Sequence, residues 1–281
     1  MKIGIAAVVI LYNPSGESLF EHIGTYHKFV TDVIVIDNSE NPNYSLLLEL
    51  QKKFKIELII NCANTGIAAA LNKGIKKAIT MGANWVITMD QDSFFEGEML
   101  KNYLSLFDKI SNKKNIAALG PVYNRSLINN KILKVESLIT SGSLINADVF
   151  KKIGGYDEKL FIDEVDNDFC YRAQIEGFNL FQCTEICMNH SLGNRKEIIT
   201  IFGQRRSTTL HAPIRIYYII RNSCYMALRY KTKFPTAIKS TRKDVLVRLK
   251  NNLLYGSNKF ATFKYAVMGY IHFKRRRFGK Y

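Results

Sequence analysis

The feature that most constrains the fold is an apolar run that leads directly into two carboxylates. Residues 85–89 (WVITM) have the length and composition of a core strand in an α/β sheet. Asp90 and Asp92 follow this run, separated by Gln91. Core strands of such sheets end at the ligand-binding edge, where paired carboxylates suit a hard divalent cation that takes oxygen ligands. In a structural alternative, the two aspartates cap a helix that begins near Phe95.

Strand and helix patterns alternate over the first 120 residues. Strands are predicted at 3–11, 32–37, 56–60, 85–89 and 116–120, with helices around 17–30, 44–54, 66–80 and 97–110. This alternation predicts an α/β fold with a mostly parallel sheet. Neither the Gly-x-Gly-x-x-Gly motif of dinucleotide-binding enzymes nor the P-loop motif of NTPases is present, which disfavours both classes.

Polar residues gather at the C-terminal ends of the predicted strands. They are Tyr12, Asn13 and Pro14 after the first strand, Asp37 at the end of the second, and Asn64 and Gly66 after the third. In an open α/β sheet these ends converge on one crevice. Each group also has a structural alternative, since Asp37 begins a good turn and Asn64-x-Gly66 is a good helix start.

Positive charge is concentrated in the last fifth of the chain. Residues 221–281 contain 16 Lys or Arg and one acid, Asp244, whereas residues 1–220 contain 24 basic and 23 acidic residues. The asymmetry predicts an α/β domain over 1–220 and a basic, aromatic-rich helical extension over 221–281. Basic helices with aromatic and aliphatic faces are typical of contacts with a membrane surface or a nucleic acid.

The remaining composition predicts a cytoplasmic protein. The five cysteines form no paired framework, which is typical of reduced thiols. The N-terminus begins a strand at once and shows no cleavage site of a signal peptide. No apolar run reaches the roughly 18 residues needed to span a bilayer.

Further motifs, taken in order over residues 3–230, resemble glycosyltransferase family 2. Besides the strand ends, they are Asn72-x-Gly74, Thr140-Ser141-Gly142-Ser143, Gly154-Gly155-Tyr156-Asp157, an acidic segment over 161–172, His190-Ser191-Leu192-Gly193 and Arg215-x-Tyr217-Tyr218-x-x-Arg221-Asn222. The last motif, together with Asp-Gln-Asp, is similar to the rhamnosyltransferase branch. The resemblance implies a GT-A fold and transfer of a sugar with inversion. The best match is L-rhamnose from dTDP-rhamnose, moved to a saccharide or lipid-linked saccharide acceptor in bacterial surface polysaccharide synthesis.

The resemblance also implies roles at the donor site. Asp37 would hydrogen-bond the pyrimidine base, and the loop 12–14 would lie along the base and ribose. Asp90 and Asp92, with His190, would hold Mg²⁺ or Mn²⁺ at the diphosphate, Asp92 being the direct ligand. The other expected donor contacts are Asn64, Gly66, Asn72, Gln91, Ser141, Gly142, Arg215 and Arg221. Many relatives carry Arg where this chain has Leu71, so that cationic contact is missing or supplied elsewhere, with Lys73, Arg215 and Arg221 as candidates.

An inverting transfer needs a base that takes the proton of the attacking acceptor hydroxyl. Residues 163–168 offer four acids in six positions. By the match to the family's acidic motif, Asp166 is the predicted base, Asp163 and Tyr156 would contact the acceptor, and Asp168 would hold the helix through a residue four positions on, Arg172. The structural alternative is an acidic helix N-terminus favoured by the helix dipole.

Other functions compete with this interpretation. A nucleotidyltransferase usually has a basic, Gly-rich loop after the first strand, whereas the loop 12–16 has no Arg or Lys. A non-catalytic scaffold would not need Asp90, Asp92 and Asp166 intact. A nucleic-acid-binding protein is suggested by the basic tail, but its leucines at helical spacing form no stacking platform.

We therefore expect the tail to meet anionic lipid at the inner face of the cell membrane, with 274–277 beside Tyr270, Phe273 and Phe278 as the strongest contact. The alternative is a solvated basic helix that only packs on the catalytic domain. The sequence does not fix the oligomeric state.

Overall fold

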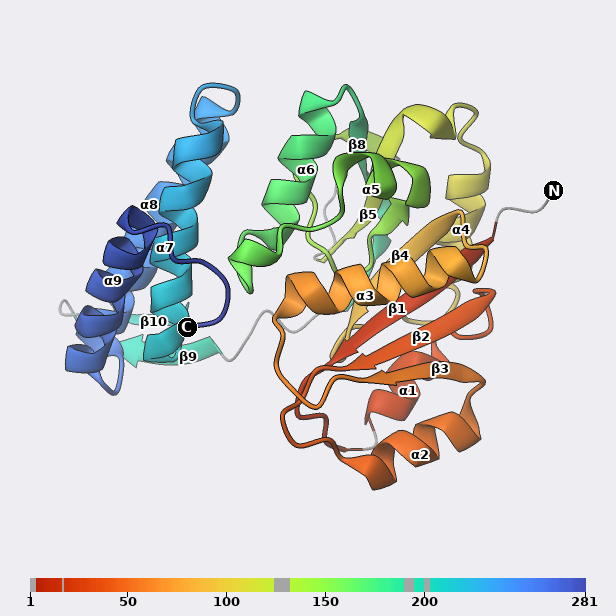
Figure 1. Cartoon of the computed structure of the whole chain (residues 1–281), viewed down its shortest axis with the longest axis horizontal. Coiled ribbons are helices and arrows are strands. Elements are labelled where there is room, and N and C mark those ends of the chain that lie inside the picture. The colour runs from red at the N-terminus through yellow and green to blue at the C-terminus, as the bar shows by residue number, and fades with distance from the viewer. Residues whose placement is uncertain (1–3, 17, 124–131, 190–194, 200–202) are drawn as a thin grey trace. The chain divides into compact units, whose positions relative to one another are not determined.

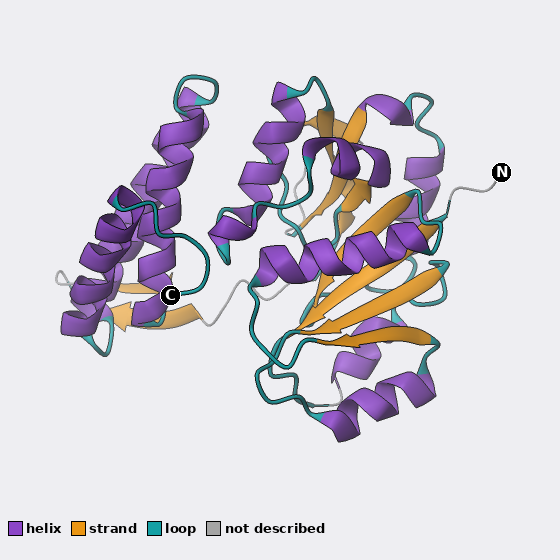
Figure 2. Cartoon of the chain, in the orientation of Figure 1, coloured by secondary structure: helices purple, strands orange, loops and turns teal. Residues whose placement is uncertain are grey.

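The computed structural model describes residues 4–16, 18–123, 132–189, 195–199 and 203–281, which divide into two units (Figures 1 and 2). The first unit comprises Met1–Glu158 and Val165–His190, and the second comprises Lys159–Glu164 and Ser191–Tyr281.

The first unit is an eight-stranded mixed sheet with helices packed on it. Its strands are β1 (Ile5–Leu11), β2 (Asp32–Asp37), β3 (Ile56–Ile60), β4 (Trp85–Asp90), β5 (Ile116–Val122), β6 (Ile132–Lys134), β7 (Leu144–Asn146) and β8 (Asn179–Cys187). Its helices are α1 (Ser18–Gly24), α2 (Tyr44–Lys53), α3 (Ile67–Thr80), α4 (Met99–Asp108), α5 (Ala147–Ile153) and α6 (Val165–Ile175), with short 3₁₀ turns at Lys113–Asn115 and Glu158–Leu160. The strand order is β3-β2-β1-β4-β7-β5-β8-β6.

Helices cover both faces of the parallel half of this sheet. All seven residues of β1 are buried, as a strand enclosed on both sides requires. Val8 faces α3, because a Cβ placed on Gly74 of that helix would lie 2.4 Å from a Val8 methyl. Val9 belongs instead to the core cluster that includes Ile23 of α1. The missing side chain at Gly74 therefore lets α3 pack closely across β1 and β2 (Figure 1).

The register of the parallel strands brings their polar ends together. Leu11 at the end of β1 pairs with Asp37 of β2, and Asp37 pairs with Ile60 of β3. On the other side, Ile10 pairs with Asp90 of β4. β7 then pairs antiparallel with both β4 and β5. The C-terminal ends of β1 to β4 thus lie at one edge, as the sequence predicts.

The second unit is helical, with one small hairpin. β9 (Arg195–Ile199) pairs antiparallel with β10 (Arg205–Thr209), and α7 (Pro213–Tyr230), α8 (Pro235–Tyr255) and α9 (Lys259–Lys274) follow. The closest helix pair is α7 with α9, where a Cβ on Gly269 would lie 2.5 Å from the Tyr217 carbonyl oxygen. Helix α7 runs through residue 220 without a break. The division of functions at residue 220 stays a prediction.

Within the described parts of the chain, the helices all fall short of the length and apolar character that a bilayer-spanning segment requires.

Candidate active site

Asp37 lies at the C-terminal end of β2 and has an oxygen without a hydrogen-bond partner among the described residues. The residue is fully buried, and its Oδ1 accepts hydrogen bonds from the Ser39 backbone N–H (3.0 Å) and hydroxyl (2.6 Å). Within the described residues, its Oδ2 has no hydrogen-bond partner. A buried polar atom left unpaired costs roughly 1–3 kcal/mol. A donor group of a ligand would recover that cost.

The loop after β1 is connected to this carboxylate and to the end of β4. The Asn13 backbone N–H donates to Ser39 Oγ at 2.7 Å, and the Tyr12 N–H donates to Gln91 Oε1 at 2.9 Å. Asn13 has a φ of 46°, in the left-handed region that Asn tolerates. Pro14 is buried in the same loop. The predicted base-binding loop and the predicted metal-binding segment are therefore one hydrogen-bonded assembly.

Asn64 and Gly66 organise the start of α3. Asn64 Oδ1 accepts from the Gly66 N–H at 3.0 Å, and Gly66 precedes the helix with a φ of 84°. Both also contact the amide of Asn38, which donates to Asn64 Oδ1 and to the Gly66 carbonyl at 3.4 Å each. Asn38 Oδ1 accepts from the Thr65 N–H (3.1 Å) and hydroxyl (2.8 Å). Asn64 and Gly66 therefore make the contacts of a helix start, as the structural alternative predicts. Contact of either residue with a nucleotide-sugar donor stays a prediction.

Asp90 and Asp92 stand at the exit of β4 with half-buried side chains. The Asp90 backbone N–H donates to Ser141 Oγ at 3.0 Å, a bond that involves the main chain of Asp90 and not its carboxylate. Between them, the Gln91 carbonyl contacts His22 Nδ1 at 2.9 Å. The described residues contain no group of three or more His, Cys, Asp or Glu side chains that could hold a metal. Two carboxylates are nevertheless a fitting donor set for Mg²⁺ or Mn²⁺, which complete their shell with phosphate oxygens and water.

Gly142 lies where three chain segments meet. Its N–H donates to the Thr88 carbonyl at 2.6 Å, and its φ is 75°. A Cβ there would lie 2.6 Å from Met188 Sδ and 2.8 Å from Pro121 Cγ. Backbone geometry and close packing of the protein itself therefore both require glycine at this position.

Tyr123, which sequence reasoning missed, lies between the two acidic groups of the site. Its hydroxyl donates to the Ser141 carbonyl oxygen. Burial, and then the negative charges of Asp90 and Asp166, hold the pKa of Tyr123 well above its usual range. Asp90 and Asp166 are thus both within electrostatic reach of one phenol. Its position directly after β5 was the available signal, because the ends of parallel strands form the ligand edge.

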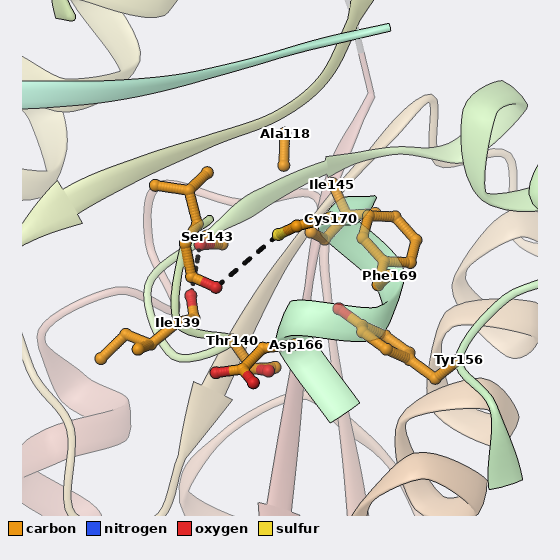
Figure 3. Close-up of a pocket in the computed structure, with 10 residues that line it drawn as sticks. Ala118, Ile139, Thr140, Ser143, Ile145, Tyr156, Asp166, Phe169 and Cys170 are labelled. Atoms are coloured by element: carbon orange, nitrogen blue, oxygen red, sulfur yellow. Dashed lines mark hydrogen bonds between the residues drawn. The ribbon is translucent and has the colours of Figure 1, made fainter. Parts of the chain in front are cut away.

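Asp166 stands in the first turn of α6. Its Oδ1 accepts from the Asn167 N–H at 2.9 Å. The side chain lines a small cavity of about 10 Å³ together with Thr140, Tyr156 and Cys170 (Figure 3). That volume is close to the minimum for one water and too small for a sugar. Burial raises the pKa of the Cys170 thiol to about 12, so this cysteine is an unreactive wall of the cavity.

Two residues expected at the ligand have structural contacts instead. Asn72 is buried, and its amide donates to the Tyr156 carbonyl at 2.9 Å and accepts from the Tyr156 N–H at 2.8 Å. Tyr156 is buried too, and its ring packs on Phe169 with centroids 4.8 Å apart. These bonds hold the glycine turn before Tyr156 against α3. Direct ligand contact by Asn72 and Tyr156 stays a prediction.

The predicted pair of Asp168 and Arg172 is present. Arg172 Nε donates to Asp168 Oδ2 at 2.7 Å, and Asp168 is fully buried. The two other guanidinium nitrogens each donate at 2.7 Å to a backbone carbonyl, those of Ile153 and Gly155. The prediction that this pair holds the helix is confirmed.

In the second unit, Arg221 is a structural residue rather than an exposed cation. It is fully buried, and its guanidinium donates to the carbonyls of Lys159 (3.1 Å), Leu160 (3.0 Å) and Gly279 (2.7 Å). The neighbouring Asn222 amide donates to the Asp163 carbonyl at 3.1 Å, among others. These contacts use the guanidinium within the fold, and the diphosphate contact expected of Arg221 stays a prediction.

Asp163 and Arg215 also belong to the second unit. Arg215 Nη2 donates to Asp163 Oδ1 at 3.0 Å, and the Arg215 side chain is half-exposed. Asp163 has a φ of 64°. Leu71, at the position where an arginine is expected, is fully buried. Lys73 on the same helix is exposed, and its ammonium donates a hydrogen bond to Asn61 Oδ1 at 2.6 Å. His190 lies outside the described residues.

Comparison with solved structures defines the class of fold. The chain is similar to S. aureus TarS 1–349 in complex with UDP-GlcNAc, with a TM-score of 0.58, 14% identity, and 98% of this chain and 82% of that chain covered. It is also similar to GalNAc-T7 with UDP, GalNAc and Mn²⁺, with a TM-score of 0.57, 14% identity and coverage of 87% and 54%. The fold is the mixed α/β GT-A fold of glycosyltransferases, as the sequence predicts.

Sequence comparison then gives the family. Residues 17–157 match the model of Glycosyl transferase family 2. The chain is 30% identical to the dTDP-rhamnosyl transferase RfbF of Shigella flexneri, over 92% of this chain and 90% of the relative. It is 22% identical to the low-salt glycan biosynthesis hexosyltransferase Agl10 of Haloferax volcanii, over 65% and 66%. The chain belongs to glycosyltransferase family 2 and is a glycosyltransferase.

Proposed function

We propose that this protein is an inverting rhamnosyltransferase of bacterial surface polysaccharide synthesis. In this proposal it transfers L-rhamnose from dTDP-rhamnose to a saccharide or lipid-linked saccharide. The relative named a dTDP-rhamnosyl transferase supports the donor, since it covers nearly the whole chain. The observation that carries the nucleotide assignment is the unpaired Oδ2 of buried Asp37. The ring N–H of a thymine or uracil base is a donor of the kind that this oxygen lacks.

The donor would lie along the edge formed by the ends of β1 to β4. Tyr12, Asn13 and Pro14 would contact the base and ribose, and Asp92, with Asp90, would hold Mg²⁺ or Mn²⁺. When bound, such an ion stabilises the negative charge that develops on the departing diphosphate. Gln91 supports this arrangement, since its side chain already accepts from the Tyr12 N–H.

Asp166 would act as the general base. Its carboxylate takes the proton of the acceptor hydroxyl while that oxygen bonds to the anomeric carbon and the bond from that carbon to the diphosphate oxygen breaks. The attack comes from the face opposite the leaving group, so the anomeric configuration inverts. The Asn167 N–H on Oδ1 supports this role, because it fixes one carboxylate oxygen and orients the other.

Asp163 is the proposed acceptor contact on the second unit. Its partner Arg215 is half-exposed and can exchange the carboxylate for a sugar hydroxyl or a phosphate. An acceptor carried by a membrane lipid would require the enzyme to work at the inner face of the cell membrane. The +15 of residues 221–281, from 16 basic residues and one acid, supports this location.

Thermal unfolding with a panel of nucleotides tests the donor assignment. We expect dTDP and dTDP-rhamnose to raise the melting temperature more than ADP or GDP, and more with Mg²⁺ or Mn²⁺ than with a chelator. Equal stabilisation by purine nucleotides would contradict the base assignment, and equal shifts with the chelator would contradict the metal. Release of dTDP from dTDP-rhamnose on adding an acceptor then measures transfer itself.

A further inference from the structure

Helix α9 has a buried face and a separate exposed apolar face. Thr262, Ala266 and Gly269 form its buried face, which packs on α7. A different side of the helix, the outer face, is made of Phe260, Phe263, Val267 and Tyr270, with exposed fractions of 80%, 60%, 41% and 50%. Intervals of three and four residues place these four side chains on one stripe of a helix with 3.6 residues per turn. The outer face is therefore a contiguous apolar surface that the fold itself does not cover.

Lysines border the outer face of α9. The other exposed residues of this helix are Lys259, Lys264 and Lys274, and it contains no acid. The same combination recurs on α8, where Leu246, Val247 and Leu254 are exposed among lysines at 239, 243 and 250. Within 221–281 the single acid is Asp244, against 16 Lys or Arg. An apolar stripe bordered by cations is the pattern of a helix that lies in the plane of a membrane interface.

We propose that the outer face of α9 is a docking surface for an anionic lipid bilayer. The four side chains enter the boundary between headgroups and acyl chains, and the bordering lysines contact the lipid phosphates. A second copy of the chain fits less well, because pairing two such faces brings two strongly positive surfaces together. A nucleic acid fits less well because the exposed apolar residues of α8 and α9 mix aliphatic side chains with the rings of Phe260, Phe263 and Tyr270, whereas base stacking uses rings alone.

The structure also moves the expected contact along the chain. From the sequence, we expected this contact at 274–277 beside Tyr270, Phe273 and Phe278. Phe278 instead packs against Tyr225, with ring centroids 4.8 Å apart, and lies under the Arg221 guanidinium. The apolar part of the surface is therefore on α9 itself. This inference does not depend on the donor or on the chemistry at Asp166.

Co-sedimentation of the full chain with vesicles tests the proposal. We expect binding to vesicles of phosphatidylglycerol and phosphatidylcholine at low salt, weaker binding at high salt, and little binding to pure phosphatidylcholine. The double variant Phe260→Ser, Phe263→Ser should lower the partition coefficient by about tenfold or more. Leu48→Ser on α2 is the matched control, because Leu48 is likewise an exposed apolar residue, with an exposed fraction of 56%. This variant should leave vesicle binding unchanged.

An inserted tryptophan gives a direct reading of the face. The natural chain has one Trp, Trp85, which is buried. Phe263→Trp adds an exposed reporter whose emission should shift to shorter wavelength with anionic vesicles, whereas Leu48→Trp should not respond. Both substitutions are at exposed positions, and circular dichroism checks that the helices are retained.

Several outcomes would overturn the proposal. Full recovery in the supernatant with anionic vesicles at low salt would do so, and so would vesicle binding that the double variant keeps in full. Dimerisation seen by light scattering and lost in the double variant would assign the face to a second copy. Binding of a single-stranded oligonucleotide that is lost in the same variant would assign it to a nucleic acid.

Discussion

Asp163 and Asp168 flank Asp166 in the sequence, and each forms an ion pair with an arginine, one pair in each unit. The surroundings of the two pairs differ. In the first unit, Asp168 and Arg172 are joined at 2.7 Å with side chains 0% and 18% exposed. In the second, Asp163 and Arg215 are joined at 3.0 Å with side chains 13% and 46% exposed. The first pair is enclosed and also holds two backbone carbonyls, so breaking it strands a buried charge. The second can exchange its partner with water or a ligand.

The same contrast holds for the units as a whole. The first unit has nearly balanced charge and keeps its polar groups at strand ends, where they bond to one another. The second unit keeps Arg221 inside and displays most of its lysines to solvent around apolar stripes. The arrangement of the polar groups at the sheet edge is the one expected for a specific small ligand, and that of the second unit's charges is the one expected for an extended surface, as we propose.

The largest expected effect separates Asp166 from its acidic neighbours. Asp166→Asn should lower turnover by roughly 10²–10⁴-fold with donor affinity kept, because it removes the base and leaves the strand ends intact. Asp163→Asn, in the pair of the second unit, should chiefly weaken acceptor binding. Steady-state kinetics with varied donor and acceptor measures both. Near-normal turnover of Asp166→Asn with a large loss in Asp163→Asn would reverse the two roles.

The next effect compares the two arginines directly. Arg172→Met leaves the carboxylate of fully buried Asp168 without its partner and should cost about 3–5 kcal/mol of unfolding free energy. Arg215→Met should cost less, about 1 kcal/mol, because the Arg215 guanidinium is half-exposed and water can replace it at Asp163. Urea unfolding followed by circular dichroism gives both values. Similar losses for the two variants would contradict the distinction between scaffold and surface.

A smaller effect concerns Asp37 at the nucleotide edge. Asp37→Asn replaces an oxygen acceptor, and can place an N–H₂ group against the N–H of the base. We expect nucleotide affinity to fall by roughly 10–30-fold, or about 1.4–2 kcal/mol, which is at the lower end of the range for one hydrogen bond with a charged group. Isothermal titration with dTDP measures it. Asp148→Asn, at an exposed position of α5, is the control and should bind dTDP unchanged.

The smallest effect is a pH dependence of the second unit. Burial, followed by the charges of Arg215 and Arg248, lowers the pKa of His211 to about 4, against the opposing charge of Asp163. The unfolded chain takes up this proton near pH 6.5, so its stabilising contribution is present above pH 6.5 and is lost as pH falls towards 4. With solvent screening, we expect a loss of roughly 1 kcal/mol between pH 7 and 5. His211→Gln should remove that part of the slope in thermal unfolding, and an unchanged slope would contradict the assignment.

Local sequence patterns predicted much of the first unit because hydrophobic runs report strand and helix directly. The predicted strands at 32–37 and 56–60 coincide with β2 and β3, and the helix at 66–80 coincides with α3. The three-residue strand β7 was missed, since so short a buried segment has no period to detect. Tyr123 was missed for a related reason, because an aromatic residue at a strand end resembles core packing.

The sequence by itself determined the family, the GT-A fold, the polar strand ends and the concentration of charge after residue 220, since these depend on residue types and their order. Tertiary structure alone decided what each polar side chain contacts. Asn72 and Arg221 are residue types that often bind ligands, yet each donates to a backbone carbonyl of the fold. Asn72 donates to Tyr156, 84 positions away, and Arg221 donates to Lys159, 62 positions away. It also decided which side of α9 is covered. The sequence of such a helix predicts burial on every side, and only the packing on α7 shows which face remains exposed.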